Sequence, residues 1–154
     1  MTNWAVVDSS LLLLLIVGRA GTAYIEQHER LRNHYDASDY RQLVLTLDLF
    51  TGIVVVPQVL AEVSNLARYI GEPARSVVLE AFRGVVDAAS ERWLRSADVM
   101  QAPDFQLYGL TDAILLRLCA DETRGVRLTL LTADQPLAYR AQSLGHRVIN
   151  YREL

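Results

Sequence analysis

Apolar residues along this chain follow two alternating patterns, short clusters that are unbroken at residues 4–7 and 53–56, and longer stretches in which they recur every three or four positions. An unbroken run of four or five apolar residues is typical of a strand buried on both faces of a parallel sheet, whereas the longer spacing is typical of an amphipathic helix. Strands are expected at residues 4–7, 53–56, 99–102, 127–131 and 147–150. Because helical patterns separate them, we expect an α/β fold with a five-stranded parallel sheet and right-handed crossovers.

Helices are expected between the strands, at residues 11–17, 25–33, 39–50, 57–70, 74–94, 112–123 and 136–144. Ser9 or Ser10 is a natural N-cap for the first helix, Asp39 for the third and Thr111 for the sixth. Residues 103–109 are expected to form a loop, with a helical turn within it as an alternative. The pattern contains no internal repeat or linker, so residues 1–154 are expected to form a single domain.

The composition is that of an ordinary globular domain, with 51% hydrophobic and 21% charged residues. The formal net charge of -3 provides no overall positive field for nucleic acid, so an RNA contact requires local arginines or metal ions. All 15 basic residues are arginines. The single cysteine, Cys119, excludes an intrachain disulfide and a cysteine-based zinc site.

The apolar run at residues 11–17 is too short to span a bilayer, which takes about 20 residues. It also lacks the basic region that precedes the core of a signal peptide, and Asp8 stands just before it. We therefore expect a cytoplasmic protein with no membrane partner.

Four acidic residues lie where the expected strands end or the following helices begin. Asp8 ends the first strand, Glu62 lies in the helix after the second, Asp112 opens the sixth helix, and Asp134 follows the fourth strand. In a parallel sheet these positions share one edge, so the four carboxylates are expected to converge.

Such convergence needs a compensating charge. Two carboxylates about 5 Å apart repel by about 3 kcal/mol at an effective dielectric constant of 20, so neutralising Asp8 alone is expected to leave the fold intact or more stable. Acidic all-oxygen sites suit Mg²⁺ or Mn²⁺. An ion held there can activate water and stabilise the charge that develops on a phosphodiester. We therefore expect phosphodiester hydrolysis.

Other acidic α/β sites fit less well. Phosphatases of the haloacid-dehalogenase type need a second aspartate two residues after the first, where this chain has Ser10. That class, the phospho-receiver domains and the P-loop proteins also use a lysine, and this chain contains none.

The acids stand in four ordered motifs: VVDSS at residues 6–10, VPQVLAE at 56–62, LTDA at 110–113 and LTAD at 131–134. In this order the motifs resemble those of the PIN-domain ribonucleases, of which the VapC-like toxins of prokaryotic toxin–antitoxin pairs are the nearest well-known members. The resemblance implies a three-layer α/β/α PIN-like fold and an endoribonuclease that depends on Mg²⁺ or Mn²⁺. It also implies an RNA substrate, a homodimer and, where the toxin role applies, an inhibitory antitoxin protein.

Carried over by motif, Asp8, Glu62 and Asp112 match the catalytic, metal-binding acids of that family, and Asp134 matches its more variable fourth acid. The supporting hydroxyl residues would be Ser9, Ser10 and Thr132. The chain departs from compact toxin members in an extra polar segment from Arg19 to Ser38. A substrate lid, an oligomer contact and an inert insertion are the alternatives for that segment.

Structural roles compete with these assignments. Asp8 and Asp134 are possible helix caps, Glu62 a surface acid, and Asp112 a favourable charge at a helix N-terminus. Phosphate contacts are possible for some of the scattered arginines, namely Arg68, Arg75 and Arg117. At the level of function, the alternatives are a catalytically silent RNA- or protein-binding module on the same fold and a nuclease that acts on DNA.

Overall fold

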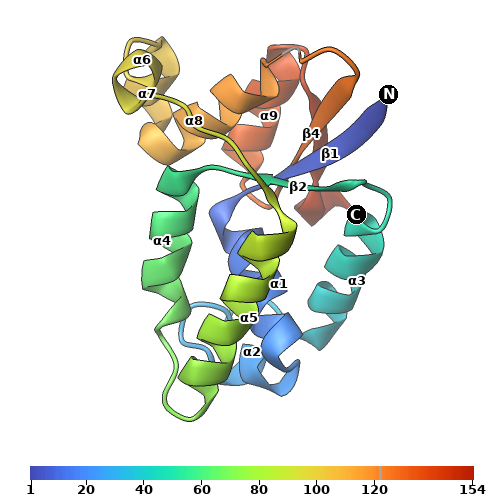
Figure 1. Cartoon of the computed structure of the whole chain (residues 1–154), viewed down its shortest axis with the longest axis vertical. Coiled ribbons are helices and arrows are strands. Elements are labelled where there is room, and N and C mark those ends of the chain that lie inside the picture. The colour runs from blue at the N-terminus through green and yellow to red at the C-terminus, as the bar shows by residue number, and fades with distance from the viewer. Residues whose placement is uncertain (122) are drawn as a thin grey trace.

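A five-stranded, all-parallel sheet forms the middle of the molecule in the computed structural model, which describes residues 1–121 and 123–154 (Figure 1). The strand order is β3-β2-β1-β4-β5. The strands are β1 (Thr2–Val7), β2 (Gly52–Val55), β3 (Ser90–Glu91), β4 (Val126–Thr132) and β5 (Arg147–Asn150). The expected α/β fold with a five-stranded parallel sheet is therefore confirmed.

Helices cover both faces of the sheet. They are α1 (Ser9–Ala20), α2 (Ala23–Gln27), α3 (Ala37–Leu47), α4 (Pro57–Ala67), α5 (Ala74–Ala88), α6 (Ser96–Val99), α7 (Pro103–Tyr108), α8 (Leu110–Cys119) and α9 (Gln135–Ser143), followed by the short 3₁₀ helix η1 (Tyr151–Glu153). Figure 1 shows α1 to α5 below the sheet and α6 to α9 above it. Right-handed crossovers require this division, because the chain steps across the sheet in one direction from β1 to β3 and in the other from β3 to β5.

The third strand differs from expectation, whereas the helical turn that was an alternative in the following loop is present. The prediction of a strand at residues 99–102 is wrong, since Val99 is the last residue of α6. The third strand is β3, which lies in the stretch expected to end the long helix, because α5 stops at Ala88. A two-residue strand at the sheet edge needs no apolar run, so its pattern carries no signal. The loop expected at residues 103–109 contains α7, which has Pro103 in its first turn.

The helix caps also differ from expectation. Asp8, and neither Ser9 nor Ser10, caps α1. Asp36 caps α3, and the expected cap Asp39 instead completes a capping box with it. Gly109, and not Thr111, precedes α8, and that helix ends at Cys119. Residue 122 of the helix expected at 112–123 lies outside the described residues.

Helix α1 is the centre of the layer below the sheet. Its residues from Leu11 to Gly18 are buried, and it contacts α2, α3, α4 and α5. A helix that is apolar on all sides is stable only when it is enclosed in this way. The enclosure fixes the start of α1, and therefore Asp8, against the sheet. No helix among the described residues has both the length and the apolar character needed to cross a membrane.

Replacing Gly18 by alanine is expected to lower the free energy of unfolding by about 1–3 kcal/mol, because a Cβ atom there would overlap the ring of Tyr40. Gly84 on α5 is the matched control, because its nearest neighbour is Arg19 Nη2 at 3.6 Å. Alanine at Gly84 is expected to stabilise the helix by up to about 1 kcal/mol. Urea unfolding of both variants checks this contrast, and a change of the same sign in the two would contradict it.

The segment from Arg19 to Ser38 is exposed along most of its length but is anchored in the core by four buried side chains. Ile25, His28 and Leu31 are fully buried or nearly so, and Tyr35 is 7% exposed. The polar helix expected at residues 25–33 is replaced by α2 and a series of turns. This segment is therefore integral to the fold, which rules out an inert surface insertion.

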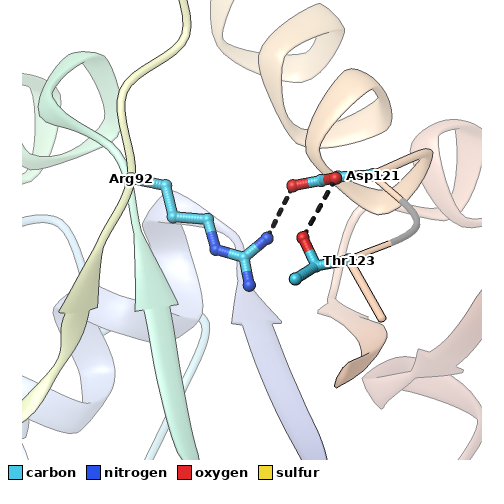
Figure 2. A network of polar contacts seen from close by, with 3 residues as sticks. All are labelled: Arg92, Asp121 and Thr123. Atoms are coloured by element: carbon cyan, nitrogen blue, oxygen red, sulfur yellow. Dashed lines mark hydrogen bonds and ion pairs between the residues drawn. The ribbon is translucent and has the colours of Figure 1, made fainter. Parts of the chain in front are cut away.

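An ion pair joins the edge of the sheet to the end of α8. Arg92, directly after β3, donates from Nη1 to Asp121 Oδ2 over 2.7 Å, and Thr123 Oγ1 donates to the other oxygen of Asp121 over 3.2 Å (Figure 2). Asp121 lies two residues beyond α8, the helix whose first turn carries Asp112. These contacts tie the far end of that helix to the β3 edge.

Candidate active site

The point at which the chain reverses its direction across the sheet lies between β1 and β4. After β1 the chain crosses to β2 on one side, whereas after β4 it crosses to β5 on the other. In open α/β sheets, ligands bind outside the carboxyl ends of the strands at such a point. Asp8 directly follows β1, Thr132 ends β4, and Asp134 comes two residues later.

Asp8 is held by hydrogen bonds from two parts of the chain, the first turn of α1 and the end of β4. Its Oδ1 accepts from Leu11 N at 3.0 Å and from Ser10 Oγ at 3.3 Å. Its Oδ2 accepts from Ala133 N at 3.0 Å and from Thr132 Oγ1. The residue is 6% exposed. Burial raises the pKa of Asp8, and the four donors act in the opposite direction. Asp8 is therefore both the cap of α1 and a bridge from β1 to the end of β4.

Glu62 reaches this edge from the second turn of α4. Pro57 starts α4 directly after Val56, so the helix leaves the sheet close to the end of β2. Ser9 Oγ, in the first turn of α1, donates to Glu62 Oε2 over 3.1 Å. Glu62 is exposed, and Ser9 is half-buried. The contact places Glu62 beside the residue that follows Asp8.

Asp112 shows most directly that the four acids share one site. It is half-buried in the first turn of α8. Burial, and then the negative charges of Asp134, Asp8 and Glu62, raise its pKa to about 6. Within the described part of the chain, none of the four acids forms an ion pair with an arginine. The structure thus brings carboxylates from four separate segments to one edge of the sheet, and among the described residues none of them is ion-paired.

Asp134 belongs to the turn that closes the site. It caps α9 by accepting from Leu137 N at 3.0 Å, and its own N–H donates to Thr132 Oγ1 over 3.0 Å. Thr132 therefore links Asp134 to Asp8. All three hydroxyl residues expected to support the acids contact them: Ser9 contacts Glu62, whereas Ser10 and Thr132 contact Asp8.

The donor set suits a hard divalent cation, since it consists of carboxylate and hydroxyl oxygens. In residues 1–121 and 123–154, no three side chains of His, Cys, Asp or Glu already lie close enough together to hold one ion. Glu62 and Asp134 are exposed, so their carboxylates have room to turn. Burial raises the pKa of Asp112, and the negative charges of Asp134, Asp8 and Glu62 raise it further; a divalent cation would offset those charges. The four acids therefore fit such an ion in charge and in chemistry.

A cavity of about 600 Å³ lies beside the acids. Glu62 and Asp134 line it, together with Arg30 and Arg152. Nothing in the sequence distinguishes these two arginines from the other 13, because one follows α2 and the other lies in η1 at the far end of the chain.

The three arginines that the sequence suggested for phosphate contacts do not line this cavity. Arg75 donates from Nε to the carbonyl of Ile70 over 2.9 Å. Arg68 lines a separate shallow cavity with Asn65 and Tyr69. Arg117 is exposed on α8.

No family model matches the chain, and no curated protein matches its sequence.

Proposed function

We propose that this protein is a metal-dependent endoribonuclease of the PIN-domain class, which hydrolyses RNA phosphodiester bonds with Mg²⁺ or Mn²⁺. One observation carries the proposal: acids from four separate segments lie at the switch point of the sheet, where hydrogen bonds link Ser9 to Glu62 and Thr132 to both Asp8 and Asp134. Burial and the charges of the other three acids raise the pKa of Asp112 there. Uncompensated acids at a ligand-binding edge are what a cation-dependent phosphodiesterase needs. The order of the four acidic motifs supports the same class.

Asp8, Glu62, Asp112 and Asp134 would hold the ion. When bound, the ion supplies an activated water and stabilises the charge that develops on the phosphate. Ser10 and Thr132 orient Asp8, and Ser9 orients Glu62. Asp112 holds a proton at low pH and releases it near pH 6, so its carboxylate is available at neutral pH.

A catalytically silent module that binds RNA or a protein is the second candidate. Two observations favour it: both oxygens of Asp8 already accept hydrogen bonds from the protein, and no three possible ligands among the described residues are gathered for one ion. The toxin role, an antitoxin partner, a homodimer and the cytoplasmic location follow from the sequence alone and stay predictions.

Calorimetric titration with Mn²⁺ separates the two candidates. The nuclease is expected to bind Mn²⁺ saturably and to gain thermal stability, because binding to the folded state alone raises the free energy of unfolding by about 2.7 kcal/mol at 100 times the dissociation constant. Asp112→Asn is expected to lose most of this gain. An absence of saturable binding in the wild type would refute the metal site. Cleavage of RNA that requires Mg²⁺ or Mn²⁺ and stops in EDTA then tests the activity, with single-stranded DNA as a competitor.

A further inference from the structure

The cavity beside the acids has two chemical characters. Glu62 and Asp134 contribute its acidic part, whereas Arg30 and Arg152 contribute cations. Its volume of about 600 Å³ lies within the range of about 300–1,000 Å³ that is usual for small-ligand sites. It can therefore hold a group of nucleotide size that carries negative charge at one end.

Both arginines are stacked on tyrosine rings. Arg30 Cζ lies 4.4 Å from the centre of the Tyr69 ring, and Arg152 Cζ lies 4.9 Å from the centre of the Tyr35 ring. Stacking orients the planar guanidinium and leaves its N–H groups at the rim. Both side chains are exposed, and among the described residues neither is ion-paired with a carboxylate. Their donors are thus oriented before any ligand binds.

Hydrogen bonds connect one of these rings to the acidic site. The hydroxyl of Tyr35 lies 3.3 Å from Ser10 Oγ, which itself donates to Asp8 Oδ1. Because Ser10 uses its proton on Asp8, Tyr35 is the donor of the pair. Tyr35 and Leu31 are buried, so the segment that carries Arg30 is anchored in the core. The backbone that carries Arg30 and the ring on which Arg152 stacks are therefore anchored beside the acids.

We propose that this cavity binds one nucleotide of a single-stranded RNA, adjacent to the phosphodiester that is cleaved, and that Arg30 and Arg152 contact its phosphate. This inference rests on the proposed function. A chain with a net charge of -3 needs local cations to hold a polyanion near four acids, and arginine pairs with phosphate through two parallel hydrogen bonds. A cavity that accepts a single nucleotide requires it to be unstacked, which a single strand allows.

The test measures the affinity of a short fluorescein-labelled single-stranded RNA by anisotropy in EDTA, where metal-dependent cleavage is suppressed. Arg30→Gln and Arg152→Gln are each expected to weaken binding by about 3- to 10-fold and to make the slope of log K against log salt shallower by about 0.7. Arg32→Gln is the matched control, because Arg32 is exposed in the same series of turns but does not line the cavity. Its affinity and slope are expected to equal those of the wild type.

A second variant separates charge from packing. Arg30→Lys keeps the phosphate contact, so its salt slope is expected to match that of the wild type, whereas a structural defect would lower the melting temperature of both Arg30 variants. Wild-type protein that does not bind the RNA, or three glutamine variants with equal affinities, would overturn the proposal. Arginine-dependent binding without cleavage in Mn²⁺ would instead overturn only the nuclease function. Cleavage with no effect of Arg30 or Arg152 on affinity would overturn only the nucleotide site.

Discussion

Replacing Asp112 by asparagine is expected to reduce RNA cleavage in Mg²⁺ or Mn²⁺ by about 10²- to 10³-fold, the loss that is typical when one electrostatic group of an active site is removed. A large loss is expected at Asp112 because the negative charges of Asp8, Glu62 and Asp134 all interact with its carboxyl group. Asp87→Asn, which neutralises an exposed acid on α5, is the matched control and is expected to keep full activity. Equal rates in the two variants, measured as the initial rate of cleavage, would remove Asp112 from the mechanism.

The same Asp112 variant has an expected effect on stability that depends on pH. The pKa of Asp112 is about 6 in the folded protein against an ordinary value of 3.8, so the folded state holds this proton more tightly. Below pH 4 the carboxyl is protonated in both states, so it does not lower the free energy of unfolding. Between about pH 4 and pH 6 the unfolded state loses its proton first, so the wild type becomes less stable as the pH rises. Above pH 6 the decrease in the free energy of unfolding reaches its full value.

In EDTA, the free energy of unfolding of Asp112→Asn is therefore expected to exceed that of the wild type by about 1–2 kcal/mol at pH 7. This value is discounted from the full shift because the carboxyl is only half-buried. The difference is expected to vanish near pH 4. Urea unfolding at several pH values measures it, and a difference that grows toward acid pH would contradict the crowding of the four acids.

Truncating Asp8 to alanine is the second large effect, and it is expected to lower the free energy of unfolding by about 2–5 kcal/mol. The change removes the cap of α1, worth about 1 kcal/mol, and leaves Leu11 N–H, Ala133 N–H and two hydroxyls without their acceptor. A buried donor left unpaired costs about 1–3 kcal/mol. Charge repulsion alone predicts that neutralising Asp8 stabilises the fold, but these four hydrogen bonds reverse the sign.

A short series of variants tests this account. Asp8→Asn keeps one accepting oxygen, so it is expected to lose about half as much stability as Asp8→Ala. Asp36→Ala removes the cap of α3, where the side chain is exposed, and is expected to cost only about 1 kcal/mol. Thermal unfolding of the three variants measures the order. Equal losses from Asp8→Ala and Asp36→Ala would show that Asp8 is only a helix cap.

Local patterns in the sequence predicted much of the sheet and the position of its acids. Strands β1 and β4 are rich in apolar residues toward their carboxyl ends, and this pattern arises because those ends are buried on both faces. Once a parallel sheet is expected, Asp8 and Asp134 necessarily lie at its carboxyl edge, because they directly follow strands. The edge strand β3 gave no such signal, since it is short, polar and held mainly by its neighbour β2.

The sequence by itself determined the alternation of strands and helices and the edge at which the four acids stand, because both depend on residues that are close together along the chain. Only the tertiary structure decided that Asp8 is held by Thr132, 124 residues away, and that Arg30 and Arg152 share a cavity with Glu62. It also decided that the segment from Arg19 to Ser38 is anchored in the core through Ile25, His28, Leu31 and Tyr35. Contacts between residues so far apart leave no periodic pattern in the sequence, because packing and hydrogen bonding in three dimensions select them.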